Sequence, residues 1–596
     1  MFTSLRDYAL LGDTRTTALV SPGGSIDWMC WPRFDSDPVF GRLIDSDGGG
    51  CFELAVTDIV DIRRRYREAS TVLVTEWRTS TGAARMTEAM AMGTRAPVLI
   101  RVLECVRGSV GATLSYRPRP GIPGRPPGDL AFSLQTFPRL ELRHDGTWSG
   151  ELHAGERLTA VLTERRSAIG GREAANMLER THLWWQRWSG DIRCGDAYRE
   201  VLVRSLITLR LLTYSPSGAP VAAPTTSLPE EIGGSRNWDY RFSWPRDASV
   251  GVAAFLAVGM HREACAFVEW LTACAASGEH GIRVLYTIDG RAGSAEHEIT
   301  DVSGYLGSLP VRVGNLAQEQ HQLDVYGWVI DAIWNLVDAG HSLGRRSRKV
   351  LADYADLVCR EWRRPDAGIW EVREEPRDYV HSKVWAWIAL DRAARTGWAL
   401  RMNRRRIAIW ESTRDEIAAE VRERGFATEL GCYVRAYGSD QLDSALLLLP
   451  LTGFDDASDL RLSGTVDAIW RELGAGGPLL YRYTPGADGL PGKEGAFLPC
   501  SFWLLEALLR LGRREEGLRL FKQVLGLAND LLLLPEEVDP ATGAYLGNYP
   551  LALSQAGLVH AVIEVQKVLE SKPADGVTTT DHPRGIGNPT APRTMV

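Results

Sequence analysis

The pattern of apolar and polar positions changes its period after residue 171. Before this point, short runs of β-branched and apolar residues lie between breaks rich in glycine and proline, such as Gly48–Gly50 and Pro118–Pro127. The runs are Thr71–Trp77, Val98–Val106, Leu140–Arg143 and Arg157–Thr163. Short, regularly spaced strands between such turns are typical of a β-sandwich. We therefore predict an N-terminal antiparallel β-sandwich domain over residues 1–171.

Helical spacing dominates the rest of the chain. Arg172–Trp188 reads as a helix, which predicts a helical linker over residues 172–195, and Asp196 is the predicted N-cap of the next helix. Further segments with this spacing are Val325–Gly340, Lys383–Thr396, Arg405–Arg424, Ser501–Leu511, Glu515–Ala528 and Leu551–Leu569. We predict a multidomain, mainly α protein with a large helical domain over residues 196–571. Residues 572–596 have few large apolar side chains, which predicts a disordered tail.

Composition narrows the class of protein. The 596 residues exceed what one simple core holds, and a net charge of −7 without a long Lys/Arg block argues against nucleic acid as a partner. No apolar run is long enough to span a membrane. The nine cysteines are dispersed and the N-terminus lacks the pattern of a signal peptide, so we expect a cytoplasmic protein with reduced thiols. The oligomeric state is not readable from the sequence.

The segment Arg236–Asp247 concentrates aromatic rings and charges without an apolar period. Aromatic faces stack on the apolar face of a sugar ring, and Arg and Asp side chains bind its hydroxyls. Trp238, Trp244, Arg246 and Asp247 are therefore candidate sugar-binding residues. An Arg-Asp pair on an ordinary protein is usually a surface salt bridge, but here it follows two tryptophans.

Two other segments supply candidate carboxylates. Trp370-Glu371 lies in a turn-like stretch before a helix, where a glutamate is ordinarily a surface residue. The tripeptide Pro-Glu-Glu occurs at Pro229–Glu231 and again at Pro535–Glu537. From spacing alone, Glu536 and Glu537 are nearly equal candidates for a catalytic base.

These segments together resemble glycoside hydrolase family 15, which contains glucoamylases, glucodextranases and trehalases. The resemblance runs from Tyr8 to about Leu569 and implies that the helical domain is an (α/α)6 toroid with its site at one end. It implies that Glu371 is the general acid, with Trp370 as its apolar wall, and that Glu536 is the general base. An inverting glycosidase needs such a pair on opposite sides of the anomeric carbon. The first Pro-Glu-Glu is implied to be a structural loop that leads into the site.

The resemblance also implies further substrate-binding residues. Arg246 and Asp247 match the pair that binds the terminal glucose. Arg482 matches an arginine that contacts the same glucose from another loop, and Glu494 is expected to contact this glucose with Arg482. Gln322 and Asp324 either face the sugar or, for Asp324, cap or pair within the helices. His381 and Lys383 either line the site or buttress the acid loop.

Other motifs are expected to have no part in binding or catalysis. The N-terminal Ser25–Ser36 is expected to form a packed interdomain contact rather than to reach over the site. Glu296-His297-Glu298 lacks a second ligand pair at a useful spacing, so no metal is expected. Nucleotide-binding motifs are absent, and no cofactor is expected.

The implied activity is that of an inverting, exo-acting α-glucoside hydrolase that releases β-D-glucose from a small α-glucoside. Trehalose is the first choice of substrate, and isomaltose or maltodextrins, cleaved at α-1,6 or α-1,4 linkages as by a glucoamylase, are the alternative. Dependence on phosphate or magnesium is left open. A disaccharide phosphorylase or a non-catalytic sugar-binding protein would be a different class.

Overall fold

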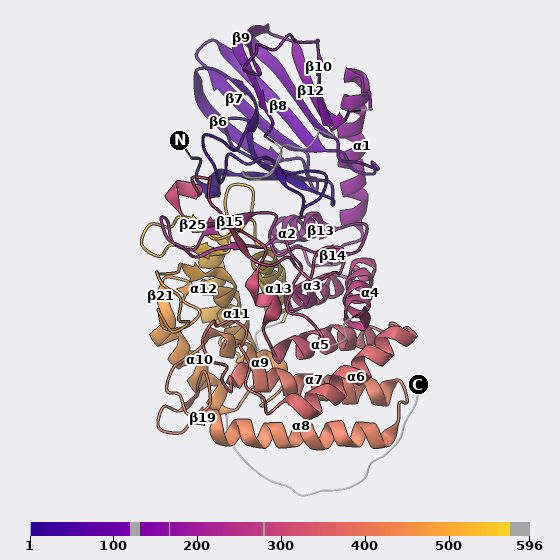
Figure 1. Ribbon diagram of the computed structural model, residues 1–596, viewed down its shortest axis with the longest axis vertical. Coiled ribbons are helices and arrows are strands. Elements are labelled where there is room, and N and C mark those ends of the chain that lie inside the picture. Colours follow the sequence, from indigo (N-terminus) through magenta and orange to yellow (C-terminus); the bar gives the residue numbers. More distant parts are fainter. Residues whose placement is uncertain (1, 120–131, 166, 278–280, 572–596) are drawn as a thin grey trace, which may run out of the picture.

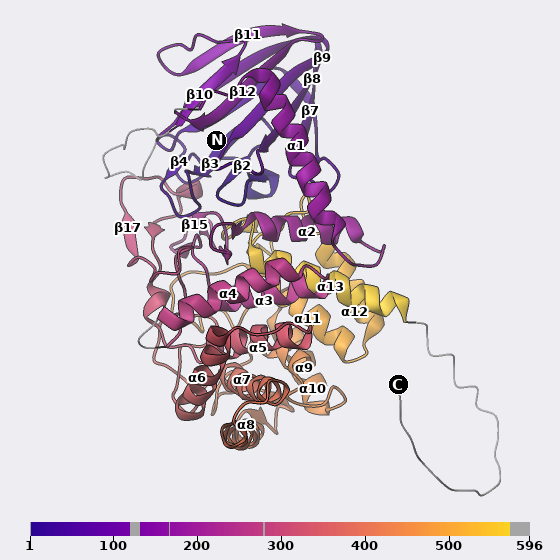
Figure 2. The same cartoon turned by 90° about the vertical axis from the view of Figure 1, so that its right-hand side faces the viewer.

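The computed structural model describes residues 2–119, 132–165, 167–277 and 281–571. A sheet domain occupies one end of the molecule and a helical domain the other, with α1 along the side of the sheets (Figures 1 and 2). The predicted tail, residues 572–596, lies outside the described residues, as does most of the predicted break Pro118–Pro127. Within the described residues, no helix is long and apolar enough to cross a membrane.

The sheet domain is an antiparallel sandwich, as predicted. Its strands are β1 (Ala9–Gly12), β2 (Thr17–Val20), β3 (Ser25–Cys30), β4 (Pro38–Phe40), β5 (Cys51–Val56), β6 (Ile59–Tyr66), β7 (Leu73–Thr79), β8 (Gly82–Met90), β9 (Leu99–Arg117), β10 (Phe132–Phe137), β11 (Thr147–His153) and β12 (Arg157–Glu164). The first half of β9 pairs with β8 and β12, and its second half pairs with β5 and β11. One long strand therefore belongs to both sheets.

Two predicted strands need correction. Val98–Val106 predicts only half of β9, because the exposed stretch Val106–Gly108 interrupts its apolar alternation where the strand crosses between sheets. Leu140–Arg143 is not a strand. There Pro138 has no amide to donate and the Leu140 amide donates to Oγ1 of Thr136, so the segment is drawn away from a ladder.

The helical domain contains α2 (Arg199–Leu211), α3 (Pro245–Ala257), α4 (His261–Ser277), α5 (Asp324–Asp338), α6 (Arg345–Glu361), α7 (Val380–Ala399), α8 (Arg404–Arg424), α9 (Leu449–Thr452), α10 (Leu460–Leu473), α11 (Leu498–Arg510), α12 (Arg514–Leu525) and α13 (Ala552–Glu570). The predicted linker helix is α1 (Gly171–Gly190). Asp196 is not an N-cap, because α2 begins three residues later with Tyr198 in the left-handed region at its N-cap.

An inner ring of helices forms the core of this domain. Along the ring, α3 packs on α5, α5 on α7, α7 on the 3-10 helix η4 (Ser444–Leu448) that continues into α9, η4 on α11, α11 on α13, and α13 back on α3. The helices between them in sequence, α2, α4, α6, α8, α10 and α12, form the outer layer. This alternation of inner and outer helices in a closed ring is the predicted (α/α)6 toroid.

Short two- and three-stranded ribbons lie in the loops between the helices. They comprise β13 (Thr213–Tyr214), β14 (Ala219–Pro220), β15 (Thr226–Pro229), β16 (Asn237–Asp239), β17 (His297–Ile299), β18 (Val311–Val313), β19 (Phe426–Ala427), β20 (Cys432–Tyr433), β21 (Gly474–Gly476), β22 (Leu479–Leu480), β23 (Ala496–Phe497), β24 (Glu537–Val538) and β25 (Tyr545–Leu546). In both views β15 lies between the sheet domain and the helices (Figures 1 and 2).

The sheet domain braces these loops through buried hydrogen bonds. Nε1 of Trp28 donates to the Pro224 carbonyl at 2.7 Å, and a nitrogen of Arg241 donates to the Ser36 carbonyl at 3.1 Å. The Tyr549 hydroxyl donates to the Tyr8 carbonyl at 2.8 Å. The segment Ser25–Ser36 is thus a packed interdomain contact, in the way the sequence predicted.

Candidate active site

The segments that precede the inner helices converge on one cavity of about 560 Å³. Its lining includes Trp244 before α3, His321 before α5, Pro376 before α7, Phe497 before α11 and Leu551 before α13. Within the described part of the chain, its lining takes no residue from the sheet domain. A cavity of this size suits a small polar ligand.

The N-terminus of α3 supplies the predicted Arg-Asp pair. Pro245 starts the helix, a position where its missing amide costs nothing, and Arg246 and Asp247 follow and line the cavity. Nη1 of Arg246 donates to Oε1 of Gln322 at 3.1 Å. Burial raises the pKa of Asp247 to about 6, although the Arg246 guanidinium opposes this shift. The pair presents a cation and a carboxyl to one end of the cavity.

Glu371 has a backbone conformation that residues other than glycine rarely adopt. Its φ is 58°, in the left-handed region, three residues after Gly368 at 69°. Nε2 of Gln320 donates to the carbonyl oxygen of Glu371 at 3.0 Å and holds the loop in this shape. The carboxylate of Glu371 lines the cavity, and its Oε1 accepts a hydrogen bond of 2.8 Å from Nε1 of Trp244. Local strain of this kind is typical of functional loops.

Trp370 forms an aromatic wall beside this loop. Its Nε1 donates to Oδ1 of Asp443 at 2.8 Å, and its ring centroid lies 5.6 Å from Phe497 and 5.9 Å from Trp503. Asp443 also caps η4 by accepting from the Ala445 amide. One carboxylate therefore fixes the wall to the inner ring.

Glu536, in the segment before β24, does not line the cavity but adjoins Tyr240 and Glu230, which do. Its Oε2 accepts from the Asn548 amide at 2.7 Å, and its Oε1 is buried without a hydrogen-bond partner among the described residues. Gly547 permits this approach, because a Cβ there would lie 2.3 Å from Oε2 of Glu536. Burial raises the pKa of Glu536 to about 8, and the negative charge of Glu230 adds to the effect.

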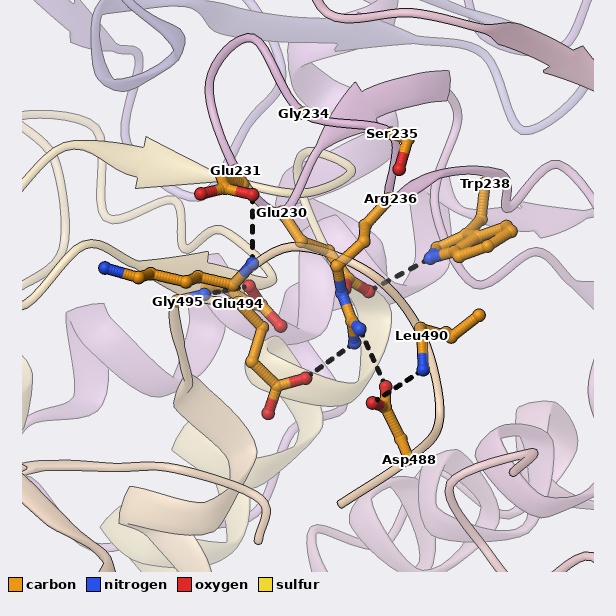
Figure 3. A network of polar contacts seen from close by, with 12 residues as sticks. Glu230, Glu231, Gly234, Ser235, Arg236, Trp238, Asp488, Leu490, Glu494 and Gly495 are labelled. Atoms are coloured by element: carbon orange, nitrogen blue, oxygen red, sulfur yellow. Dashed lines mark hydrogen bonds and ion pairs between the residues drawn. The ribbon is translucent and has the colours of Figure 1, made fainter. Parts of the chain in front are cut away.

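A buried network of charges lies beside Glu536. Arg236 reaches between Glu230, Asp488 and Glu494, at 2.5, 2.7 and 2.7 Å (Figure 3). Nη2 of Arg482 lies 2.7 Å from Glu494 and 3.2 Å from each of Glu230 and Glu537. The oxygens of Glu230, Glu494 and Glu537 lie within 4.8 Å of one another, a spacing that would suit a metal ion, but the Arg482 guanidinium supplies the positive charge there.

The structure brings some of the predicted binding residues to the cavity and places others behind it. Trp238, Trp244, Arg246, Asp247, Trp370 and Arg482 line it. Glu494 does not, since its carboxylate lies in the network with the two arginines. Gln322 is buried and contacts the cavity through Arg246.

Asp324, His381 and Lys383 are buried behind the cavity. Oδ2 of Asp324 lies 3.6 Å from Arg246, at the first residue of α5. Burial, with a smaller contribution from Arg246, holds the pKa of His381 well below its usual value, so this imidazole is neutral. Nζ of Lys383 donates to the Trp362 carbonyl at 2.7 Å and pairs with Asp378 at 2.8 Å, so it supports the segment between α6 and α7 that carries Glu371.

Several residues of the site were not singled out in the sequence. Gln320 and Asp443 form hydrogen bonds with Glu371 and Trp370 from distant segments. The sequence around Gln320 or Asp443 contains no pattern that would indicate this role. Glu230 lines the cavity, so the first Pro-Glu-Glu does more than lead the chain into the site. Its repetition at Pro535–Glu537 was a signal that could have identified it.

Comparison with known proteins assigns the family. Residues 196–563 match the family described as glycosyl hydrolases family 15, and residues 3–127 match the trehalase-like N-terminal family. The chain belongs to glycoside hydrolase family 15 and is a glycoside hydrolase.

Similar proteins of nearly equal length include trehalases from bacteria and archaea. The chain is 36% identical to a trehalase of Mycolicibacterium smegmatis, over 97% of this chain and 93% of the relative. It is 34% identical to a trehalase of Thermoplasma volcanium, over 95% and 94% of the two chains. A bacterial glucoamylase solved in complex with acarbose shares the fold, with a TM-score of 0.67 at 13% identity over 95% of this chain and 94% of the other.

Proposed function

We propose that the protein hydrolyses trehalose with inversion and releases β-D-glucose. The observation that carries this proposal is the meeting of two loops at one small cavity, one with Glu371 at its wall and the other with Glu536 just behind it. The trehalase relatives over almost the full chain support trehalose as the substrate. A cavity of this small size suits removal of a single terminal glucose.

In the proposed mechanism, Glu371 protonates the glycosidic oxygen as its bond to the anomeric carbon breaks. Both contacts of this carboxyl, with Trp244 at 2.8 Å and with Arg246 at 3.4 Å, fall on Oε1. We assign the transferred proton to Oε2. Water attacks the opposite face of the anomeric carbon, and Glu536 takes its proton, which leaves the new hydroxyl in the β configuration.

Arg246 and Asp247 are proposed to bind the hydroxyls of the terminal glucose, while Trp370 and Trp238 cover its apolar faces. Trp238 is held rigidly for this purpose. Its Nε1 donates to Glu230 at 3.1 Å, and the guanidiniums of Arg312 and Arg373 lie 4.8 and 4.5 Å from its ring. A fixed platform loses little entropy when the sugar binds.

Hydrolysis of trehalose, maltose and isomaltose followed by NMR tests the proposal. Glu371→Gln and Glu536→Gln should each lower kcat by about 10²–10⁴-fold, the usual contribution of a general acid or base. Glu375→Gln changes an exposed carboxylate of the same loop and should leave kcat unchanged. From trehalose, inversion should release β- and α-glucose in equal initial amounts, because the leaving glucose keeps its own α configuration. Initial release of α-glucose alone, or full activity of either variant, contradicts the mechanism. Preference for maltose or isomaltose would replace only the substrate.

We also propose that the enzyme acts in the cytoplasm, where trehalose is a small dissolved sugar. The described residues contain no disulfide bond, and a reducing compartment is compatible with the buried thiols of Cys105 and Cys432. Fractionation of the source cells, with activity assayed in each fraction, tests this location.

A further inference from the structure

The two Pro-Glu-Glu segments, far apart in the sequence, meet at the edge of the cavity, where Glu230 of the first segment lines it. The Gly547 amide donates to the Pro229 carbonyl at 2.8 Å, and the next amide, of Asn548, donates to Glu536 at 2.7 Å. Nδ2 of Asn548 also donates to the Trp238 carbonyl at 2.9 Å. One short segment therefore ties the loop that carries Glu230 to the loop that carries the proposed base.

Glu230 is held more firmly than a carboxylate of an ordinary loop. It is 2% exposed, and its Oε2 accepts from Arg236 at 2.5 Å and lies 3.2 Å from Nη2 of Arg482. Its Oε1 accepts from Nε1 of Trp238 at 3.1 Å. Every contact comes from an N–H donor, and two of the donors are cations, an arrangement that favours the ionised carboxylate.

Both negatively and positively charged groups surround Glu536. The titratable groups that face it are Glu230 from the segment after β15, Tyr240 from the segment after β16, Arg482 from the segment after β22 and Glu537 in β24. Burial alone would raise the pKa of Glu230, but Arg482 and Arg236 outweigh it and hold the pKa below its ordinary value. Burial, and then Glu230, raise the pKa of Glu537 well above the ordinary value. Glu230 is therefore the fixed negative charge of the group.

We propose that Glu230 is a positioning residue for Glu536: its carboxylate, fixed by Arg236 and Arg482, keeps a negative charge beside the base and makes it a stronger proton acceptor from water. This inference rests on the proposed role of Glu536. A stronger base takes the proton of water more readily in the transition state. The cost is that the base stays protonated to a higher pH, so the same charge also sets the acidic limb of the pH profile.

The test compares the pH dependence of kcat/KM for trehalose in wild type, Glu230→Gln and Glu231→Gln. Loss of the Glu230 charge should move the acidic limb to lower pH by roughly one unit, the effect of a nearby like charge. It should also lower the plateau, because the base becomes weaker. Glu231→Gln is the matched control in the same tripeptide, since its carboxylate contacts only the Lys493 amide, at 2.9 Å, among the described hydrogen bonds. Its limb should stay at the wild-type position.

Two further variants separate charge from packing. Glu230→Asp keeps the charge, so its limb should stay near the wild-type position even if kcat falls. Glu230→Ala removes the same charge and replaces Glu230→Gln if that variant is unstable, because the smaller side chain leaves room for water to solvate the unpaired guanidiniums. An unmoved limb in a folded Glu230→Gln or Glu230→Ala enzyme overturns the inference.

The same data distinguish this inference from the proposed function. If Glu536→Gln is inactive but Glu230→Gln shows the wild-type limb, the base assignment stands and only the inference falls. If Glu536→Gln remains active with the wild-type profile, the base lies elsewhere and both fall.

Discussion

Nε1 of Trp244 donates a hydrogen bond of 2.8 Å to Oε1 of Glu371 and so joins the first residue before α3 to the acid loop before α7. Because α3 and α7 both flank α5 in the inner ring, this bond spans the cavity wall. It fixes the orientation of a carboxylate whose backbone is already in the left-handed region. The proposed acid therefore depends on two elements of the ring.

Trp244→Phe keeps the ring but removes the donor. We expect kcat for trehalose to fall about tenfold, the effect of losing one hydrogen bond to a charged group, with a smaller change in KM. Trp398→Phe is a matched control, because the exposed indole of Trp398 donates to Glu411 at 2.9 Å far from the cavity. Steady-state kinetics on both variants checks the prediction, and equal losses would contradict it.

Asp443→Ala should lower both stability and activity. It removes the acceptor of the Trp370 indole and the N-cap of η4 together. Loss of the cap costs about 1 kcal/mol, and release of Trp370 should lower kcat/KM in addition. Asp459→Ala removes the N-cap of α10 and an ion pair with Arg461, neither of which touches Trp370, and should lower the thermal midpoint without changing kcat/KM. If both variants keep full activity, the Trp370 wall does not need its anchor.

Glu537 should make the protein less stable as pH rises. Burial raises its folded pKa well above the ordinary value, so the folded state retains a proton that the unfolded chain loses. The contribution of this retained proton to the free energy of unfolding is complete below the pKa of Glu537 in the unfolded chain, about 4.3. It declines by about 1.4 kcal/mol per pH unit above that value, until the pH passes the pKa of Glu537 in the folded state. Glu537→Gln removes this penalty, so its thermal midpoint should fall less than that of wild type between pH 5 and pH 9. Calorimetry checks this, and parallel curves would exclude Glu537 as the source.

Asn529→Ala should weaken the junction between the sheet domain and the helical ring. Nδ2 of Asn529 donates to the Tyr549 hydroxyl and to the Arg6 carbonyl, both at 3.0 Å. The substitution also leaves the buried amides of Leu531 and Leu533 without their acceptor, Oδ1 of Asn529, so the loss should be about 1–3 kcal/mol. Asn403→Ala, which removes only the exposed N-cap of α8, is the control. A greater loss of thermal midpoint in the first variant supports the prediction; equal losses contradict it.

The regular part of the fold could be predicted from the sequence because its physical cause is local. Lys383–Thr396, for example, lies within α7, and Arg157–Thr163 within β12. Helix α3 was not predicted from periodicity, since it is buried nearly all round and has no polar face to alternate with. Helix α6 was not predicted either, because arginine and other charged residues dominate its sequence and leave only a narrow apolar stripe.

The site was predictable only as far as its residues lie in continuous motifs. Trp370 and Glu371 are adjacent in sequence, so the loop that brings both to the cavity could be singled out. Asp443 and Gln320 act on that loop through side-chain bonds from distant segments, which only the closure of the ring brings together. Pairing across such distances leaves no local pattern.

The closure of the ring by α13 against α3 orders events during synthesis. The ribosome delivers the Arg-Asp pair and the acid loop first, whereas Glu536 and α13 emerge near the end of the described chain. A nascent chain that ends at α11 carries the proposed acid and sugar-binding residues but lacks Glu536, the proposed base. Under the proposed mechanism, hydrolysis can therefore begin only after translation has passed α13 and this last inner helix has packed on the first.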